Sequence, residues 1–135
     1  MMADSGSRYG LPARRWQVLL DEAAGLLVEL ARRGQTISYS QLSYQLKSAR
    51  IHHFSYAMVG LLDDLSVRDA QSGRPLLATL VVRQSSGRPG PGYFRKTAAQ
   101  HGTPAQQERF WQEQLAAVCA YWQGAAGKRV GSNSN

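Results

Sequence analysis

Five cationic residues lie in or beside one short stretch of the chain: Arg74, Arg83, Arg88, Arg95 and Lys96. Guanidinium groups can hold a phosphate through two parallel hydrogen bonds, and the N–H groups of a glycine-rich loop can approach it closely. The loop Ser85–Pro91 within this stretch is rich in glycine and proline. The stretch therefore predicts a stiff basic loop suited to phosphate contact. The alternative is a solvated hairpin whose charges prevent edge-to-edge aggregation.

A second group of polar and aromatic residues lies at or just before the start of an expected helix: Arg50, His52, His53, Ser55 and Tyr56. Side chains of these types can reach base edges or phosphates. Asp63 and Asp64, further along the same helix, would repel a nucleic acid, so only its N-terminal half is expected to read one. The alternative is that the histidine pair only caps the helix.

The sequence holds no arrangement typical of catalysis or of a metal site. Adjacent histidines on a helix point in different directions, and no third ligand follows His52 and His53 at a useful spacing. No Ser-His-Asp set and no nucleotide-binding glycine loop can be assembled. We therefore expect no catalytic residue, no metal and no cofactor, although a site assembled across space from His53, Asp63 and Asp64 stays open.

Three helices are expected to position these groups. The first begins near Pro12, carries an apolar stripe from Trp16 to Leu30 and stops at Gly34. The second begins at Tyr39, after a capping box formed by Ser38 and Gln41, and ends around residues 47–50. The third has its buried stripe at helical spacing: Phe54, Met58, Leu61, Leu62 and Leu65. A short turn between the second and third helices is typical of a helix-turn-helix.

The remaining expected elements are strands and a last helix. Residues 76–83 are apolar and β-branched, which predicts a buried strand, and residues 92–96 predict a returning strand. Residues 36–38 predict a short first strand. Thr103 and Pro104 begin a last helix, which should lie across the core and has an apolar stripe of its own: Trp111, Leu115, Val118 and Trp122.

This order of elements predicts an α+β fold of the winged helix-turn-helix type. It would have three helices, a small antiparallel β-hairpin wing with its tip at Ser85–Pro91, and an added C-terminal helix. We expect one domain over residues 11–123, between a flexible N-terminal arm at 1–10 and a flexible C-terminal tail at 124–135.

Composition agrees with one globular domain and suggests an anionic partner. The chain of 135 residues is 43% hydrophobic, carries a net charge of +7 and has a pI near 10.1. A basic balance of this size is common in proteins that bind nucleic acid, although surface arginine can also serve solubility alone. The single cysteine, Cys119, excludes an internal disulfide. No apolar run is long enough to cross a bilayer, so we expect a cytoplasmic protein without a membrane partner.

The segment Thr36–Leu46 resembles the helix-turn-helix entry of winged-helix proteins and of the alkyltransferase-like DNA-binding domain. The pattern Leu76–Phe94, followed by an aromatic-rich last helix, is similar to that of small uncharacterised bacterial proteins. The resemblance covers most of residues 12–122 and implies a DNA-binding fold. The Pro-Cys-His-Arg motif of alkyltransferases is missing, and Cys119 lies among aromatic residues instead, which excludes alkyl transfer.

The sequence thus predicts a non-enzymatic winged-helix protein that binds nucleic acid, with double-stranded DNA favoured over RNA. An alternative on the same fold is an adaptor for a protein partner. A weaker alternative is a small nuclease or hydrolase that uses His53 and the acidic pair. The last helix could also join two copies into a homodimer.

Overall fold

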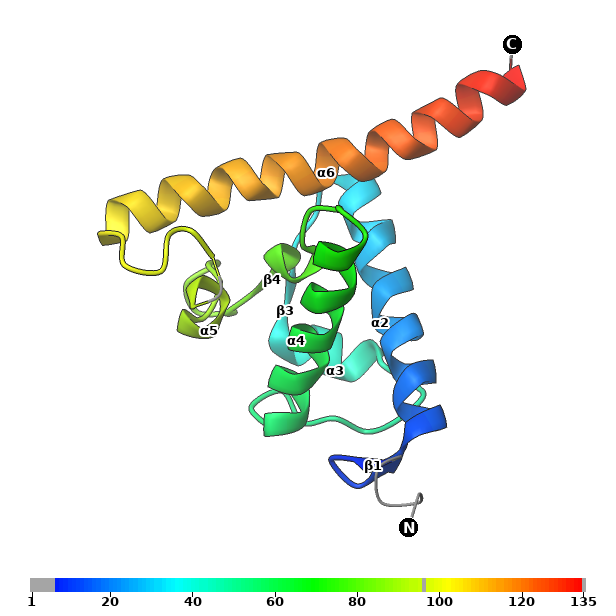
Figure 1. Cartoon of the computed structure of the whole chain (residues 1–135), viewed down its shortest axis with the longest axis vertical. Coiled ribbons are helices and arrows are strands. Elements are labelled where there is room, and N and C mark those ends of the chain that lie inside the picture. The colour runs from blue at the N-terminus through cyan, green and yellow to red at the C-terminus, as the bar shows by residue number, and fades with distance from the viewer. Residues whose placement is uncertain (1–6, 96, 135) are drawn as a thin grey trace.

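The computed structural model describes residues 7–95 and 97–134, and this part of the chain is mostly helical (Figure 1). In chain order the elements are β1 (Ser7–Arg8), β2 (Leu11–Pro12), α2 (Ala13–Arg33), β3 (Ile37–Ser38), α3 (Tyr39–Gln45), α4 (Tyr56–Gln71), η1 (Leu77–Leu80), β4 (Val81–Val82), α5 (Pro91–Phe94) and α6 (Pro104–Ser134). Strands β3 and β4 form a small parallel sheet between the helices. The broad α+β class is therefore as predicted.

Helix α2 follows its sequence signals closely. It begins after Pro12, and most of its predicted stripe is buried, with Leu19 and Leu27 fully excluded from water, whereas Leu26 and Leu30 are partly buried. Gly34 ends the helix with a φ of 68°, a left-handed conformation that glycine adopts without strain, and its N–H bonds to the Ala31 carbonyl at 3.1 Å.

The chain just before α2 is packed, which differs from the expected loose arm. Strand β1 pairs antiparallel with β2, and the Tyr9 ring lies 5.3 Å from that of Trp16. Tyr9 also lies against Gly60, where an added Cβ would come within 2.5 Å of the ring. Arg8 pairs with Asp64 at 3.1 Å. Residues 1–6 of the expected arm lie outside the described residues.

Strand β3 and helix α3 form where the capping box predicts them. The Ser38 hydroxyl accepts the Gln41 N–H at 3.1 Å, which begins α3 at Tyr39. The connection that follows α3 is held by a residue of α2. The Glu22 carboxylate accepts the N–H groups of Lys47, at 2.7 Å, and Ser48, at 2.9 Å. This clamp fixes the path of the chain toward α4.

The predicted antiparallel hairpin is not formed within the described residues. Residues 77–80 make a 3₁₀ turn, and only Val81 and Val82 are extended; they pair in parallel with Ile37 and Ser38. Residues 91–94 form the helical turn α5, begun by Pro91 at its first position. The strand propensity of residues 76–83 is overridden because the segment is buried among α2, α4 and α6.

A buried carboxylate holds the start of this segment. Asp69, at the end of α4, is only 1% exposed. Its Oδ2 accepts the Leu77 N–H at 2.9 Å, and its Oδ1 pairs with the Arg74 Nε at 3.2 Å. The turn from α4 into η1 therefore depends on a polar contact that the sequence pattern did not indicate.

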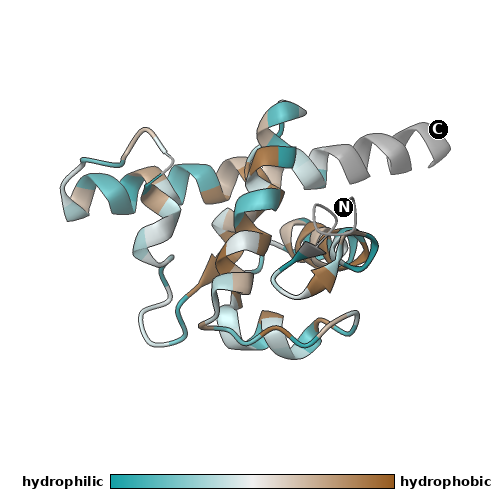
Figure 2. Ribbon diagram, turned by 60° about the horizontal axis from the view of Figure 1, so that its bottom comes forward, coloured by the Kyte–Doolittle hydropathy of each residue, from teal (hydrophilic) through white to brown (hydrophobic). Residues whose placement is uncertain are grey.

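Helix α6 begins at the predicted place and crosses the core as expected. Thr103 Oγ1 accepts the Gln106 N–H, and the Gln106 side chain accepts the Thr103 N–H, a reciprocal cap. The buried Trp111 donates its Nε1–H to the Thr79 carbonyl at 3.0 Å. Val118 is fully buried. Figure 2 shows the hydrophobic residues gathered on the central strands and on the helices around them.

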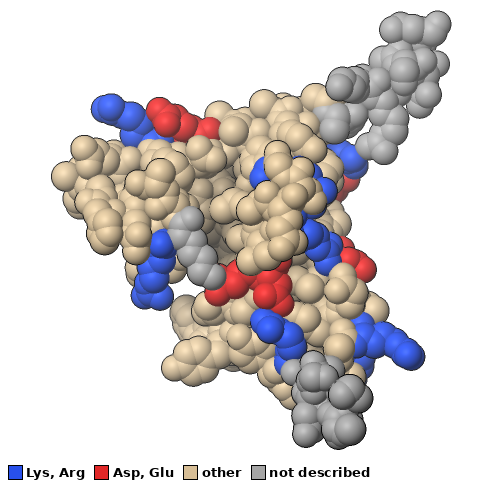
Figure 3. All heavy atoms as spheres, in the orientation of Figure 1, with Lys and Arg blue, Asp and Glu red and all other residues tan. Residues whose placement is uncertain are grey.

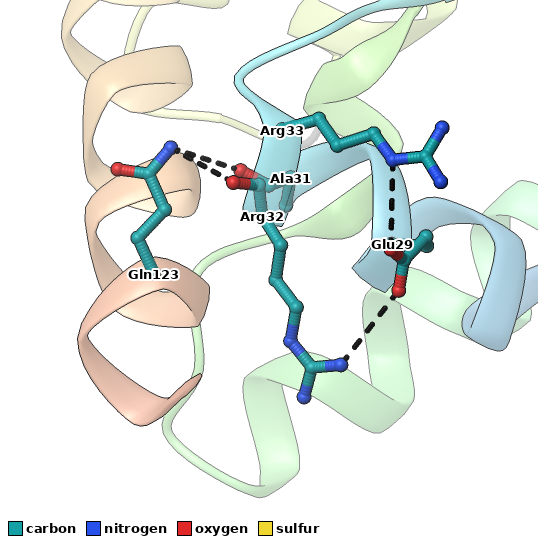
Figure 4. Close-up of polar contacts among 5 residues, drawn as sticks. All are labelled: Glu29, Ala31, Arg32, Arg33 and Gln123. Carbon is teal, nitrogen blue, oxygen red and sulfur yellow. Dashed lines mark hydrogen bonds and ion pairs between the residues drawn. The ribbon is translucent and has the colours of Figure 1, made fainter. Parts of the chain in front are cut away.

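The far part of α6 reaches the end of α2 and continues. Gln123 donates to the carbonyls of Ala31, at 3.4 Å, and Arg32, at 3.3 Å, beside the ion pairs that Glu29 makes with Arg32 and Arg33 (Figure 4). The backbone remains helical through Ser134, where the sequence predicted a flexible tail from residue 124. No helix in the described part of the chain has the length and apolarity needed to span a membrane.

Candidate functional site

A cleft of about 330 Å³ lies between the N-terminal half of α4 and the segment from Arg83 to Arg95. Helix α3 contributes Tyr39 to the lining, and Leu76 and Ala78 contribute part of its apolar surface. Its polar lining residues are Tyr39, His53, Ser55, Asp63, Ser66, Arg83, Tyr93 and Arg95. The cleft therefore joins the basic stretch and the histidine stretch, which the sequence singled out separately.

The turn before α4 shapes one side of the cleft. Ser55 caps the helix by accepting the Met58 N–H at 3.2 Å, and its own hydroxyl donates to the His52 carbonyl at 2.6 Å. The Phe54 N–H donates to the His52 Nδ1 at 3.1 Å. These bonds close the turn tightly, so Phe54 and Tyr56 on either side of the cap project into solvent.

The other side of the cleft is a loop closed by its own backbone. The Arg83 N–H donates to the Arg88 carbonyl at 2.7 Å, and the Gly87 N–H donates to the Arg83 carbonyl at 2.8 Å. Gly87 has a φ of 69°, which permits this reversal. Gly90 is buried, and its N–H donates to the Tyr39 hydroxyl at 3.4 Å. The loop is therefore fixed to the start of α3.

The structure divides the predicted cationic residues into two groups. Arg83 and Arg95 both line the cleft, and neither has a carboxylate partner among the described residues. Arg74 is instead held by the buried Asp69, and Arg88 pairs with Glu108 on α6 at 2.9 Å. Both guanidinium groups are thus paired with carboxylates of other elements. Lys96 lies outside the described residues.

The predicted residues around the start of α4 also divide. His53 and Ser55 line the cleft, whereas Arg50, His52 and Tyr56 are exposed beyond its lining. Phe54 was predicted to belong to the buried stripe of the third helix, and this is wrong. The helix begins at Tyr56, two residues after Phe54, so the stripe that faces the core starts at Met58.

An exposed aromatic cluster results, which the sequence pattern did not reveal. Phe54 is 83% exposed and Tyr56 is 85% exposed. The rings of His52 and His53 are stacked with their centroids 4.5 Å apart, and the His53 ring lies 4.2 Å from that of Phe54. We call Phe54 and Tyr56 the aromatic pair. A solvent-facing surface with two such side chains beside a cleft is typical of a binding site.

The acidic residues of α4 face different surroundings. Asp63 is the one carboxylate among the described residues that line the cleft. Asp64 does not line the cleft; it accepts the Trp16 Nε1–H at 2.8 Å and pairs with Arg8. The three residues considered for a hydrolytic site are thus split, since Asp64 serves the N-terminal hairpin. Figure 3 shows a group of acidic atoms near the middle of the face drawn there, with basic atoms both beside this group and at the edges.

The two tyrosines of the cleft are neutral hydrogen-bonding groups. Burial raises the pKa of Tyr39, and the neighbouring Gly90 N–H and Arg83 only partly offset this. Burial likewise raises the pKa of Tyr93, whose hydroxyl is bonded to Thr79 at 2.9 Å. Both hydroxyls therefore keep their protons at neutral pH, and Tyr39 can donate one to a bound group.

The described residues give the cleft neither a set of metal ligands nor a reactive thiol. No group of three or more possible metal ligands exists among them. Cys119 is half-buried on α6, and burial raises the pKa of its thiol. Comparison with protein-family models, with curated proteins and with solved structures gave no match. What the cleft binds must therefore be argued from its own geometry.

Proposed function

We propose that this protein binds nucleic acid, DNA in preference to RNA, at the mouth of the cleft. In this proposal it is a non-enzymatic domain of the winged helix-turn-helix type. Helices α3 and α4 form the helix pair, and the segment 83–95 takes the place of the wing without forming a hairpin. The expected cytoplasmic location belongs to the same proposal.

One observation carries the proposal: Phe54 of the exposed aromatic pair lines the same cleft as two arginines that no described carboxylate neutralises. Planar side chains stack on bases or wedge between base steps, and guanidinium groups hold the phosphates on either side. Arg50, which is exposed on the connection before α4, can extend the phosphate contacts.

The residues on the exposed face of α4 distinguish base reading in the major groove from insertion of apolar side chains between bases. Its side chains near the helix start are Tyr56 and Val59, and neither offers the amide or guanidinium pattern that reads bases in the major groove. Asp63 follows on the same helix. We therefore favour insertion of apolar side chains into the minor groove or against unpaired bases, with little sequence selectivity.

Fluorescence anisotropy with random-sequence duplex and single-stranded DNA at two salt concentrations tests the proposal. The double variant R83A/R95A should weaken binding to all sequences alike. It should also reduce the steepness of log K against log salt concentration, the salt slope, by about 0.9 for each phosphate that the protein no longer neutralises. The control R33A/R109A removes the same charge from exposed positions outside the cleft and should change the slope less.

The aromatic pair is tested separately with F54A/Y56A. Loss of stacking should weaken binding by about 1–3 kcal/mol for each stacked base, with the salt slope unchanged. V67A, an exposed apolar position further along α4, is the matched control. Absence of binding by the unaltered protein at low salt would reject the proposal.

A protein-binding adaptor is the second candidate, and the apolar character of the same surface favours it. Val59 is 56% exposed and adjoins the cleft beside Phe54. A purified complex with a protein at fixed stoichiometry, abolished in F54A/V59A, would support this function over the first. Self-association through α6 belongs to this second candidate, since Tyr121 there is 41% exposed.

A further inference from the structure

We propose that the cleft binds a small carboxylic acid with an apolar, ring-sized body, and that its carboxylate lies between Arg83 and Tyr39. This goes beyond nucleic-acid binding and does not depend on it. The groups that would recognise the acid, Arg83 and Tyr39, line the cleft. Of the aromatic pair only Phe54 contributes to the lining, and its side chain is mostly exposed.

The size and lining of the cleft favour an apolar body. Its volume of about 330 Å³ lies at the lower end of the range for small-molecule sites, which favours a ligand of one or two rings. Its apolar lining includes Met58, Leu62, Leu76, Ala78 and Pro91. Met58 is only 1% exposed. Such a surface contacts hydrocarbon well and offers a ring no hydrogen bonds.

The charges of the cleft favour an anion. Two arginines line it against one carboxylate, that of Asp63, so the lining has a net positive charge when histidine is neutral. Arg83 has no carboxylate partner among the described residues. A ligand with one negative charge would balance the lining.

Gly90 shows where the anion would be held. A Cβ at this position would lie 3.3 Å from the Tyr39 hydroxyl oxygen and 3.6 Å from the Arg83 Nε, so both groups converge on the same backbone position. The Tyr39 oxygen already accepts the Gly90 N–H, and its own hydrogen remains available. The Tyr39 O–H and the Arg83 guanidinium are two donors for the two oxygens of a carboxylate.

NMR titration of the full chain, without nucleic acid, tests this inference. The probes are 2-naphthoate and its uncharged analogue 2-naphthamide. Naphthoate should shift the backbone amide signals of Arg83, Gly90 and Gly92, and naphthamide should bind at least about tenfold more weakly because it lacks the charge that Arg83 holds.

Two variants locate the carboxylate. R83Q should remove the preference for naphthoate over naphthamide, whereas R109Q, an exposed arginine of α6, should leave it unchanged. G90A adds a methyl group between Tyr39 and Arg83 at a backbone conformation that alanine tolerates, with a φ of −72°. It should weaken naphthoate binding without unfolding the protein, as checked by its NMR spectrum.

Three results would overturn the inference. They are the absence of shifts at the cleft amides at millimolar naphthoate, equal affinities for the two probes, and a loss of the preference for naphthoate in R109Q as large as that in R83Q. The outcome is separable from that of the proposed function, because naphthoate binding is measured without DNA. Binding of naphthoate by a protein that fails to bind DNA would uphold the site and reject the nucleic-acid proposal.

Discussion

Replacing Asp69 by alanine should destabilise the protein by about 3 kcal/mol. The substitution leaves the buried Leu77 N–H without an acceptor, which costs about 1–3 kcal/mol. It also removes the partner of Arg74, whose side chain is 26% exposed and is therefore only partly rehydrated. Loss of a buried ion-pair partner costs about 3–5 kcal/mol, and the partial exposure of Arg74 places the effect at the low end.

Urea unfolding followed by circular dichroism would measure this loss of stability. In thermal unfolding, the melting temperature should fall by roughly 10 °C. D21A is the matched control. Asp21 likewise pairs with an arginine, Arg68 of α4, at 3.0 Å, but the Asp21 side chain is 62% exposed. Exposed pairs contribute at most about 1 kcal/mol. If D69A and D21A lost equal stability, the reasoning about burial would be refuted.

D69N separates the hydrogen bond from the charge. The asparagine oxygen can still accept the Leu77 N–H, so D69N should lose less stability than D69A. Burial raises the pKa of Asp69 above its ordinary 3.8, and the bonds from Leu77 and Arg74 offset this only partly. Protonation therefore favours the folded state. The contribution of Asp69 should decline as the pH rises from 3.8 through its raised pKa, and D69N should remove that slope.

Glu22 should show the opposite dependence on pH. Burial acts to raise its pKa, but hydrogen bonds from Ser48 and Lys47 outweigh this and lower it from 4.5. Its stabilising effect should be present above pH 4.5 and disappear as the pH falls through the folded-state pKa. In E22Q the free energy of unfolding should therefore fall less steeply with decreasing pH, and an unchanged pH dependence would contradict the clamp. W111F should lose about 1–2 kcal/mol in urea unfolding, because the Thr79 carbonyl is left without its donor; unchanged stability would mean that water replaces the indole.

Elements defined by neighbouring residues could be predicted from the sequence. The N-cap at Ser38, the stop at Gly34 and the start at Pro104 depend on interactions within a few positions, and all three are found as predicted. Such local hydrogen bonds are encoded in residue type and spacing.

Features that depend on distant residues could not be predicted in this way. The residue types after Leu76 predict a strand. The conformation of this segment is instead set by the hydrogen bonds that it makes with Asp69 and Trp111 and by its pairing with β3. Arg74 and Arg88 could not be separated from Arg83 and Arg95 by sequence alone, since their partners lie on other elements. The exposure of Phe54 follows from a shift of two residues in the helix start, which periodicity does not resolve.

The parallel pairing of β3 with β4 has a consequence for the order in which the chain acquires its site. Parallel strands must be joined by a long connection, here the whole of α3 and α4, so their pairing closes a large loop at an entropic cost. Arg83 directly follows β4 and is positioned only once that loop has closed. During synthesis on the ribosome, the cleft would therefore be completed only after Arg95, the last residue of its lining in chain order, had emerged.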